Sequence, residues 1–312
     1  MEIVFDIVLP IFGVVMIGYG ATRFGLFDSA SEKGLATFVF NFVIPLFLFR
    51  SLANADLPSQ IPWGFFGTYY IAALGCYFTG MVVARVIFKR NFGGQVITGF
   101  GNAFSNNVLL GLPLILTTFG EKATFPFFLI LSIHGLVFFT LTTFLLEYDR
   151  NRDTSIANLP RQIGTSILKN PILMSIFIGL AFNLTNVTIP GPIDDIAALM
   201  QKAITPCSLF ALGASLTKYG FAGRLSQSLV MVSFKLIIMP AMVFFLGTQV
   251  FDISRLWLMV AVLMAAQPSG VMAYMFASKY KAGEAIATTS IFLSTGLSLI
   301  SLSVILYLLD VR

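Results

Sequence analysis

The chain has 312 residues, of which 57% are apolar, 14% are aromatic and only 11% are charged, and its formal net charge is +5. A soluble domain carries roughly 25% charged residues, so a soluble protein of this composition would expose a large apolar surface. The composition therefore indicates an all-α polytopic membrane protein that is embedded in a lipid bilayer and has no nucleic-acid partner.

The apolar runs predict ten membrane-spanning helices, because a span needs about 20 mostly apolar residues. The runs are continuous and do not alternate as barrel strands do, which favours helices. No connection is long enough for a soluble catalytic domain, and no glycine-rich phosphate-binding motif is present, so neither an enzyme nor a cofactor is predicted. In chain order, the predicted spans are residues 4–22, 35–52, 63–85, 96–119, 123–146, 171–189, 203–219, 227–250, 256–279 and 284–308.

Lysine and arginine are distributed unequally between alternate connections. Of the 19 Lys and Arg residues, 13 lie in the odd-numbered connections, five lie in the even-numbered connections and the termini, and Lys235 lies inside a predicted span. Because cytoplasmic loops are enriched in these residues, both termini are predicted to lie on the non-cytoplasmic side of the cell membrane. The longest connection is polar and cytoplasmic, and it divides the chain into a first unit (1–150), a linker (151–170) and a second unit (171–312).

Prolines and polar segments indicate that the second unit repeats the first. The proline matches are offset by 161 residues and the polar segments by 163, so one two-residue insertion reconciles them. Each unit has an odd number of predicted spans, so the second begins on the opposite face of the membrane. This five-plus-five inverted repeat is typical of secondary transporters. The matching positions are Pro10 with Pro171, Pro45 with Pro206, and 105–121 with 268–284.

The fourth and ninth predicted spans contain residues that interrupt membrane helices. Residues 99–113 hold three Asn, three Gly, a Ser and a Pro, and residues 265–270 hold a Gln-Pro-Ser-Gly run. A broken helix exposes up to four unpaired N–H groups and a positive dipole end, which is tolerable in a membrane where it lines a cavity. Two matched breaks therefore predict a binding site for an anion. The candidate substrate-binding residues are Asn102, Asn106, Asn107, Gln267, Pro268 and Ser269.

Several segments resemble one transporter family. The run from Asn106 to Leu114 resembles the fourth-helix crossover of the auxin efflux carrier family, within the superfamily of bile-acid, arsenite and riboflavin transporters. Residues 170–173, 206–216 and 235–240 resemble its sixth, seventh and eighth helices. The resemblance covers nearly the whole chain.

The resemblance implies a ten-helix fold with broken crossover helices 4 and 9, like that of bile-acid sodium symporters. It implies a scaffold of helices 1, 2, 6 and 7, and a crossover domain of helices 3–5 and 8–10 that moves by an elevator-like or rocking step. Substrate would bind between them, and Asn106 matches the family's crossover asparagine. The family includes plant auxin exporters and bacterial carriers of malonate or malate, so the implied substrates are small mono- or dicarboxylates or auxin-like aromatic carboxylates.

Three other polar residues lie inside predicted spans. His134, the single histidine, is near the middle of the fifth span and is a candidate for proton coupling, or for a neutral structural role. Lys235 lies in the eighth span, where it either holds unwound carbonyls or occupies the place of a coupling cation. Asn41 precedes Pro45 in the second span and is a further candidate for substrate contact. Acidic residues are absent from the middle of the crossover spans, so sodium coupling is less favoured than proton coupling or uniport.

Two other functions compete with a carrier. A channel or a non-transporting sensor would share the same fold. An intramembrane serine protease would need Ser269 and His134 to form a dyad, and the residues before Ser269 do not match the expected Gly-x-Ser-Gly motif. The sequence leaves the oligomeric state, a homodimer included, undetermined.

Overall fold

The computed structural model describes residues 4–55, 57, 63–150 and 170–310. Within these ranges the chain forms helices and turns with a single isolated antiparallel bridge, so the predicted all-helical fold class is confirmed. Seven of these helical stretches are long and apolar enough to cross a membrane. The count of ten spans and the inverted repeat stay predictions. The seven stretches are Asp6–Arg23, Ser29–Ala53, Trp63–Val86, Asn107–Asp149, Gly191–Leu216, Leu225–Val250 and Glu284–Leu308.

The first part of the chain contains long helical stretches joined by short turns. The connection between the fifth and sixth predicted spans covers residues 147–170. In the structure, α7 extends to residue 150, and residues 151–169 lie outside the described residues. The elements are η1 (Val4–Val8), α1 (Leu9–Arg23), α2 (Ser29–Phe38), η2 (Val39–Val43), α3 (Ile44–Ala53), α4 (Trp63–Val86), α5 (Phe92–Ala103), η3 (Asn107–Gly111), α6 (Leu112–Phe119), η4 (Gly120–Ala123) and α7 (Thr124–Arg150).

The second part of the chain contains shorter helices. Two apolar helices, α9 and α14, are shorter than the seven long stretches. The elements are α9 (Pro171–Leu184), α10 (Gly191–Gln201), α11 (Ile204–Leu216), α12 (Leu225–Ser233), η6 (Phe234–Ile238), α13 (Met239–Phe245), η7 (Leu246–Val250), α14 (Arg255–Ala265), α15 (Met272–Tyr280) and α16 (Glu284–Leu308).

Helix α10 occupies a segment that the sequence analysis assigned to a connection. Pro192 lies in its first turn, where a missing N–H costs nothing, and Asp194 is close enough to the N-terminus to favour the positive end of the helix dipole. Helix α2 also begins earlier than predicted, at Ser29, because the carboxylate of Asp28 accepts the N–H of Ser31 at 2.8 Å and caps the helix. A prediction based on apolar runs does not detect helix starts that consist of polar residues.

Four π-helical turns each precede a proline. Pro10, Pro45, Pro113 and Pro240 are the second residues of α1, α3, α6 and α13, and the five residues before each of these helices form a π-turn. A proline ring displaces the carbonyl four residues earlier, and a wider turn accommodates that displacement. These prolines therefore bend continuous helical stretches without ending them.

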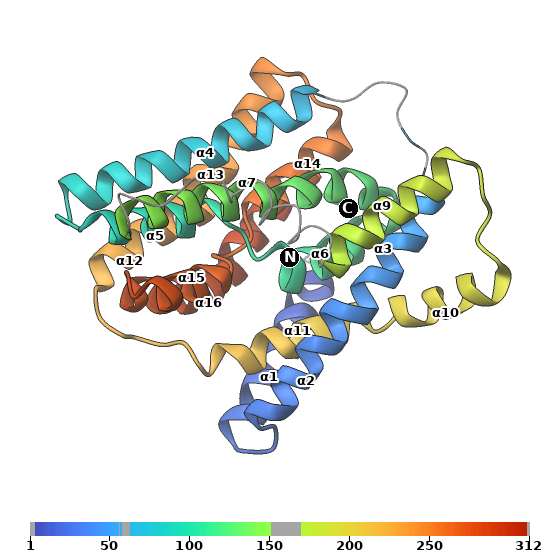
Figure 1. Ribbon diagram of the computed structural model, residues 1–312, viewed down its shortest axis with the longest axis horizontal. Coiled ribbons are helices and arrows are strands. Elements are labelled where there is room, and N and C mark those ends of the chain that lie inside the picture. Colours follow the sequence, from blue (N-terminus) through green and yellow to red (C-terminus); the bar gives the residue numbers. More distant parts are fainter. Residues whose placement is uncertain (1–3, 56, 58–62, 151–169, 311–312) are drawn as a thin grey trace.

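The helices gather in two groups (Figure 1). In one group α1 packs along α11 and α3 packs along α9, with α2 and α10 beside them. In the other group α4 packs along α5, and α12 to α16 surround α5 and α7. The η3–α6 segment lies between the groups, because it contacts both α11 and α7.

Two glycines bring α1 and α11 into backbone contact. A side chain at Gly18 would collide with the carbonyl oxygen of Phe210, and one at Gly213 would collide with the carbonyl oxygen of Val15. Close approach through small residues is a common way for membrane helices to associate, because lipid supplies no hydrophobic driving force between them. The α1–α11 contact therefore depends on the absence of Cβ atoms at these two positions.

We expect Gly18→Ala to destabilise the protein by about 1–3 kcal/mol, because the added methyl group forces two helix backbones apart. Gly13→Ala is the matched control on the same helix, since no atom lies within 4 Å of its added Cβ atom. The midpoint of thermal unfolding in detergent measures both variants. Equal midpoints for the two variants would show that the α1–α11 contact is not as tight as the structure has it.

Candidate functional site

Two helices are interrupted where the sequence predicted breaks. Helix α5 ends at Ala103, and helical structure resumes at Asn107. Helix α14 ends at Ala265, and α15 begins at Met272. Pro268 explains the second break, since it lacks an N–H group and disfavours a helical conformation in the residue before it. The first break, between Ala103 and Asn107, contains no proline.

The two breaks cross each other as a short antiparallel pair. Ser105 and Ser269 form the bridge. The N–H of Asn106 donates to the carbonyl oxygen of Pro268 at 2.9 Å, and the N–H of Gly270 donates to the carbonyl oxygen of Phe104 at 2.9 Å. Backbone groups that leave a helix inside a membrane need partners, and here each break supplies them to the other.

Side chains of the crossing satisfy further backbone groups. The hydroxyl of Ser269 donates to the carbonyl oxygen of Gly101 at 2.9 Å, which lies in the last turn of α5. The N–H of Ser269 donates to the hydroxyl of Ser294 on α16 at 3.1 Å. The amide of Gln267 donates to the carbonyl oxygen of Leu263 at 2.9 Å, within its own helix end. These bonds tie the crossing to α5, α14 and α16.

Lys235 is fully buried beside the second break. Its ammonium group donates to the carbonyl oxygen of Ala265 at 2.7 Å and lies 3.1 Å from the sulfur of Met239. Ala265 is the last residue of α14, where the helix dipole presents partial negative charge. The geometry therefore favours the structural interpretation of Lys235, in which it holds a carbonyl that the break has freed.

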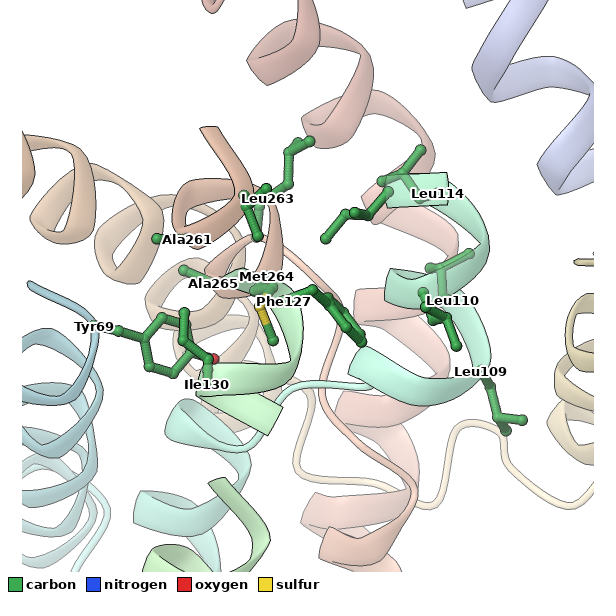
Figure 2. Close-up of a cluster of buried hydrophobic side chains, with 14 of the residues drawn as sticks. Tyr69, Leu109, Leu110, Leu114, Phe127, Ile130, Ala261, Leu263, Met264 and Ala265 are labelled. Carbon is green, nitrogen blue, oxygen red and sulfur yellow. The ribbon is translucent and has the colours of Figure 1, made fainter. Parts of the chain in front are cut away.

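Apolar side chains pack the half-helices around the crossing (Figure 2). Leu110 and Leu114 belong to the η3–α6 segment, Phe127 to α7, and Leu263 to α14, and all four are almost completely buried. Dispersion contacts among close-packed side chains hold these short helices together where their backbone hydrogen bonding stops. The polar crossing is thus enclosed in an apolar shell.

A cavity of about 680 Å³ lies beside the crossing. Four of the predicted site residues line it, namely Asn41, Asn106, Asn107 and His134. Its other walls are mostly apolar, and none of its described lining residues is Asp, Glu, Lys or Arg. Those other lining residues are Phe40, Phe104, Ser105, Val108, Leu109, Leu131, Ser132, Gly135, Leu136, Phe139, Thr140, Thr143, Asn170, Pro171, Ile172, Leu173, Gly270, Val271 and Met272.

Polar atoms next to this cavity have no protein partner within the described residues. They include the amide nitrogen of Asn106 and Nδ1 of His134, and also the side chains of Ser105 and Asn107, which have the hydroxyl of Tyr69 as a neighbour but form no described hydrogen bond. A buried polar group without a hydrogen bond costs about 1–3 kcal/mol, so such groups are rare unless something binds them. Together they form the strongest candidate for a binding site in the described part of the chain.

The remaining predicted residues lie behind the crossing and do not line the cavity. Asn102 faces α4, where its amide lies against Gly80. Gln267, Pro268 and Ser269 hold the two breaks together, and Lys235 holds the end of α14. The lining residues that were not predicted as site residues come mainly from α7 and the start of α9. Apart from Asn170, they carry apolar or hydroxyl side chains or are glycine, which give no signal of a site in one sequence.

The described hydrogen bonds do not join Ser269 to His134. The hydroxyl of Ser269 donates to Gly101, and Nε2 of His134 accepts the N–H of Ser105. The serine hydroxyl and Nε2 each have another partner, and the described residues show no nucleophile–base contact of the kind found in serine hydrolases.

A polar network lies at the end opposite to Asn170. Arg50 donates to both carboxylate oxygens of Asp194, at 2.8 and 3.3 Å, and to the amide oxygen of Gln201 at 3.2 Å. Gln201 in turn donates to the carboxylate of Glu121 at 2.9 Å. Asn170 begins α9, whereas this network lies near the other end of that helix. A second cavity, of about 670 Å³, lies at this network.

Comparison with known proteins identifies the class. A family model described as "Membrane transport protein" matches residues 3–306. The "Putative malonate transporter" of Rhizobium meliloti is 23% identical over 307 residues, which cover 97% of this chain and 95% of that protein. An "Uncharacterized transporter" of Methanocaldococcus jannaschii is 27% identical and covers 95% of each chain. "Auxin efflux carrier component 5" of Arabidopsis thaliana is 20% identical and covers 95% of this chain and 93% of that one.

The helical membrane fold and the family match define a membrane transport protein. The chain belongs to the auxin efflux carrier family of membrane transport proteins, and the match covers nearly its whole length. The resemblance found in the sequence is thereby confirmed.

We expect Ser269→Ala to destabilise the protein by about 1–3 kcal/mol, because the carbonyl oxygen of Gly101 then lies buried without a donor. Ser303→Ala is the control, since the hydroxyl of Ser303 donates only to Leu299 of its own helix and its loss has little effect. Thermal unfolding in detergent distinguishes the two. A Ser269→Ala variant as stable as the control would mean that this hydroxyl does not support the crossing.

Proposed function

We propose that the protein is a secondary transporter of small organic anions, which binds its substrate in the cavity beside the crossing. The observation that carries this proposal is the placement of helix ends. The cavity is lined by residues 106–109 and 270–272, which lead into η3–α6 and α15. Both are helix N-termini, which present free N–H groups and partial positive charge. The unpartnered amides of Asn106 and Asn107 add donors at the same place.

The opposite helix ends are turned away from the cavity. The C-terminus of α14 is held by the ammonium of Lys235, and the last turn of α5 is held by the hydroxyl of Ser269. Neither residue lines the cavity. A substrate in the cavity therefore meets the donor ends of the broken helices, which favours an anion such as a carboxylate.

The names of the relatives support a carboxylate without fixing which one. One relative is named for malonate and another for auxin. A cavity of about 680 Å³ with Phe40, Phe104 and Phe139 in its walls has room for an aromatic carboxylate as well as a short dicarboxylate. We therefore propose mono- and dicarboxylates as the substrate class.

Alternating access is the proposed mechanism. Helices α1–α3 and α9–α11 form the scaffold, and helices α4–α7 and α12–α16 form the moving crossover domain. The cavity takes Asn41 and residues 170–173 from the first group and most other lining residues from the second. The ten-span, five-plus-five inverted repeat belongs to this proposal, since two halves of opposite orientation can exchange conformations.

The proposed orientation makes this an inward-facing state. The cavity extends to Asn170 and Thr143, which lie at the end that the distribution of Lys and Arg assigns to the cytoplasm. The network of Arg50, Gln201 and Glu121 then closes the non-cytoplasmic side. Glu121 is the crossover domain's residue in this network, so opening requires the contacts of Glu121 to break together with the packing of η3–α6 against α11.

Proton coupling or uniport fits this site better than sodium coupling. The described lining residues include no carboxylate, and the buried cation Lys235 already neutralises one helix C-terminus. A sodium ion would have to rely on carbonyl and hydroxyl oxygens alone.

We expect Asn106→Ala to lower counterflow of a labelled carboxylate in proteoliposomes by roughly 10- to 100-fold, since a hydrogen bond to a charged group contributes about 1.5–3 kcal/mol. Malonate and indole-3-acetate are the probes. Gln249→Ala is the control, because that exposed side chain contacts only Thr248. Unchanged flux in Asn106→Ala would count against this cavity. Ohmic current in the unmodified protein would indicate a channel, and binding without counterflow would indicate a sensor.

Cross-linking tests the proposed closure. In a background of Cys76→Ala and Cys207→Ser, a short bifunctional thiol reagent should join Glu121→Cys to Gln201→Cys and stop counterflow, because the scaffold and the crossover domain can then no longer separate. A reductant should restore the flux if the reagent is linked through disulfides. The Glu121→Cys variant alone is the control. Full flux in the cross-linked protein would exclude movement at this contact.

A further inference from the structure

We infer that His134 binds the substrate carboxylate as a neutral imidazole, donating from Nδ1, and that the backbone of the crossing sets this tautomer. The inference rests on the proposed function and assigns the histidine a role as a fixed hydrogen-bond donor in the same cavity. Three observations carry it, namely the acceptor bond at Nε2, the unpartnered Nδ1 and the packing of the ring.

The first observation is the hydrogen bond from the crossing. The N–H of Ser105 donates to Nε2 of His134 at 3.4 Å. This N–H belongs to the break after α5, where the helical acceptor is lost. A nitrogen that accepts a hydrogen bond carries no proton, whereas an imidazolium carries a proton on both nitrogens. The bond from Ser105 therefore selects the neutral ring and puts its single proton on Nδ1.

The second observation is that Nδ1 has no partner. It is buried, and no described residue accepts a hydrogen bond from it. His134 lines the cavity together with Asn106 and Asn107, whose amide nitrogens are also without partners. These atoms are buried just behind the cavity wall, and a carboxylate oxygen that reached them from the cavity would satisfy them.

The third observation is that the ring is held in place. It stacks on Phe104, with ring centroids 4.7 Å apart, and meets the edges or faces of Phe138 at 4.9 Å and Tyr69 at 5.6 Å. Phe104 belongs to the crossing itself, so the ring and the break are fixed relative to each other. A donor that is positioned in advance binds an anion without the entropic cost of ordering the side chain.

The surroundings do not favour a proton carrier. Among the described residues, the titratable side chains that pack against the imidazole are Tyr69 and Tyr70 on α4, through their rings, and the ammonium of Lys235 on η6 also acts on it electrostatically. Protonation of Nε2 would break the bond to Ser105 and add a second buried positive charge in the domain that already holds Lys235. His134 therefore acts as a donor throughout the cycle, and any coupled proton is carried elsewhere.

The single histidine allows a direct measurement of the tautomer. Protein labelled with ¹⁵N-histidine and purified through a tag without histidine gives one imidazole. We expect its ¹⁵N spectrum to show a protonated Nδ1 and an unprotonated Nε2 from pH 5 to pH 8. A protonated Nε2, or titration of the ring within this range, would overturn the inference.

Three substitutions then test substrate binding by thermal shift and calorimetry with malonate and indole-3-acetate. Nδ-methylhistidine, introduced at position 134 by amber suppression, keeps the acceptor and removes the donor, so affinity should fall about tenfold or more. His134→Gln keeps a donor and an acceptor, so it should bind within a few-fold of the unmodified protein and leave the pH profile of uptake unchanged. His134→Phe keeps the ring and removes both groups, and it should lose binding.

The outcomes separate this inference from the proposed function. Unchanged affinity in the methylated protein, together with lost affinity in Asn106→Ala, would overturn the role of His134 and leave the carboxylate site standing. A flattened pH profile in His134→Gln would identify His134 as a proton carrier and also overturn the inference. Absence of any carboxylate binding by the unmodified protein would overturn both.

Discussion

The structure depends on one constraint, which is that a backbone leaving its helix inside a membrane must find hydrogen-bond partners within the protein. The chain meets this constraint by crossing two broken helices. The N–H groups of Asn106 and Gly270 donate to the carbonyl oxygens of Pro268 and Phe104, respectively, and these bonds form a short antiparallel pair. Each break supplies hydrogen-bond partners to the backbone groups of the other, so neither break would be stable alone inside a membrane. The pairing thus fixes where the two halves of the chain meet.

Other side chains of the site bind the backbone groups that the antiparallel pair of breaks does not satisfy. Ser269 reaches the last turn of α5, Lys235 reaches the end of α14, and His134 accepts the N–H of Ser105. These contacts involve side chains that look unrelated in the sequence, since they come from helices far apart along the chain. Their common feature is that each binds a backbone group which a continuous helix would have satisfied. Apolar side chains pack on the sides of the crossing that face away from the cavity, and their low polarity strengthens the hydrogen bonds there.

The sequence was sufficient to predict the helical membrane class, the family and both breaks, because these depend on composition and on local residues. Pro268 and the asparagines around residue 106 disrupt a helix wherever it packs. The sequence did not distinguish residues that support the crossing from residues that line the cavity. Asn102 and Asn106 are alike in type and lie four positions apart, yet one faces α4 and the other faces the cavity. Helix α10 was also missed, because its start is marked by proline and acidic residues and not by an apolar run.

Lys235 and Ser269 bind carbonyl groups at two of the helix ends, and we propose that this unequal treatment of the helix ends sets the chemical preference of the cavity. Carbonyl ends carry partial negative charge, and the protein covers them from within, using Lys235 for α14 and Ser269 for α5. The N–H ends are left beside the cavity with the amides of Asn106 and Asn107. A site built from two broken helices has, by symmetry, as many donor ends as acceptor ends and no preference for either charge. In the proposed carrier, the buried ammonium and the hydroxyl remove that balance in favour of an anion, while no cationic side chain stands among the described residues of the cavity wall. In the proposed carrier the substrate therefore binds through oriented dipoles and not through a fixed ion pair.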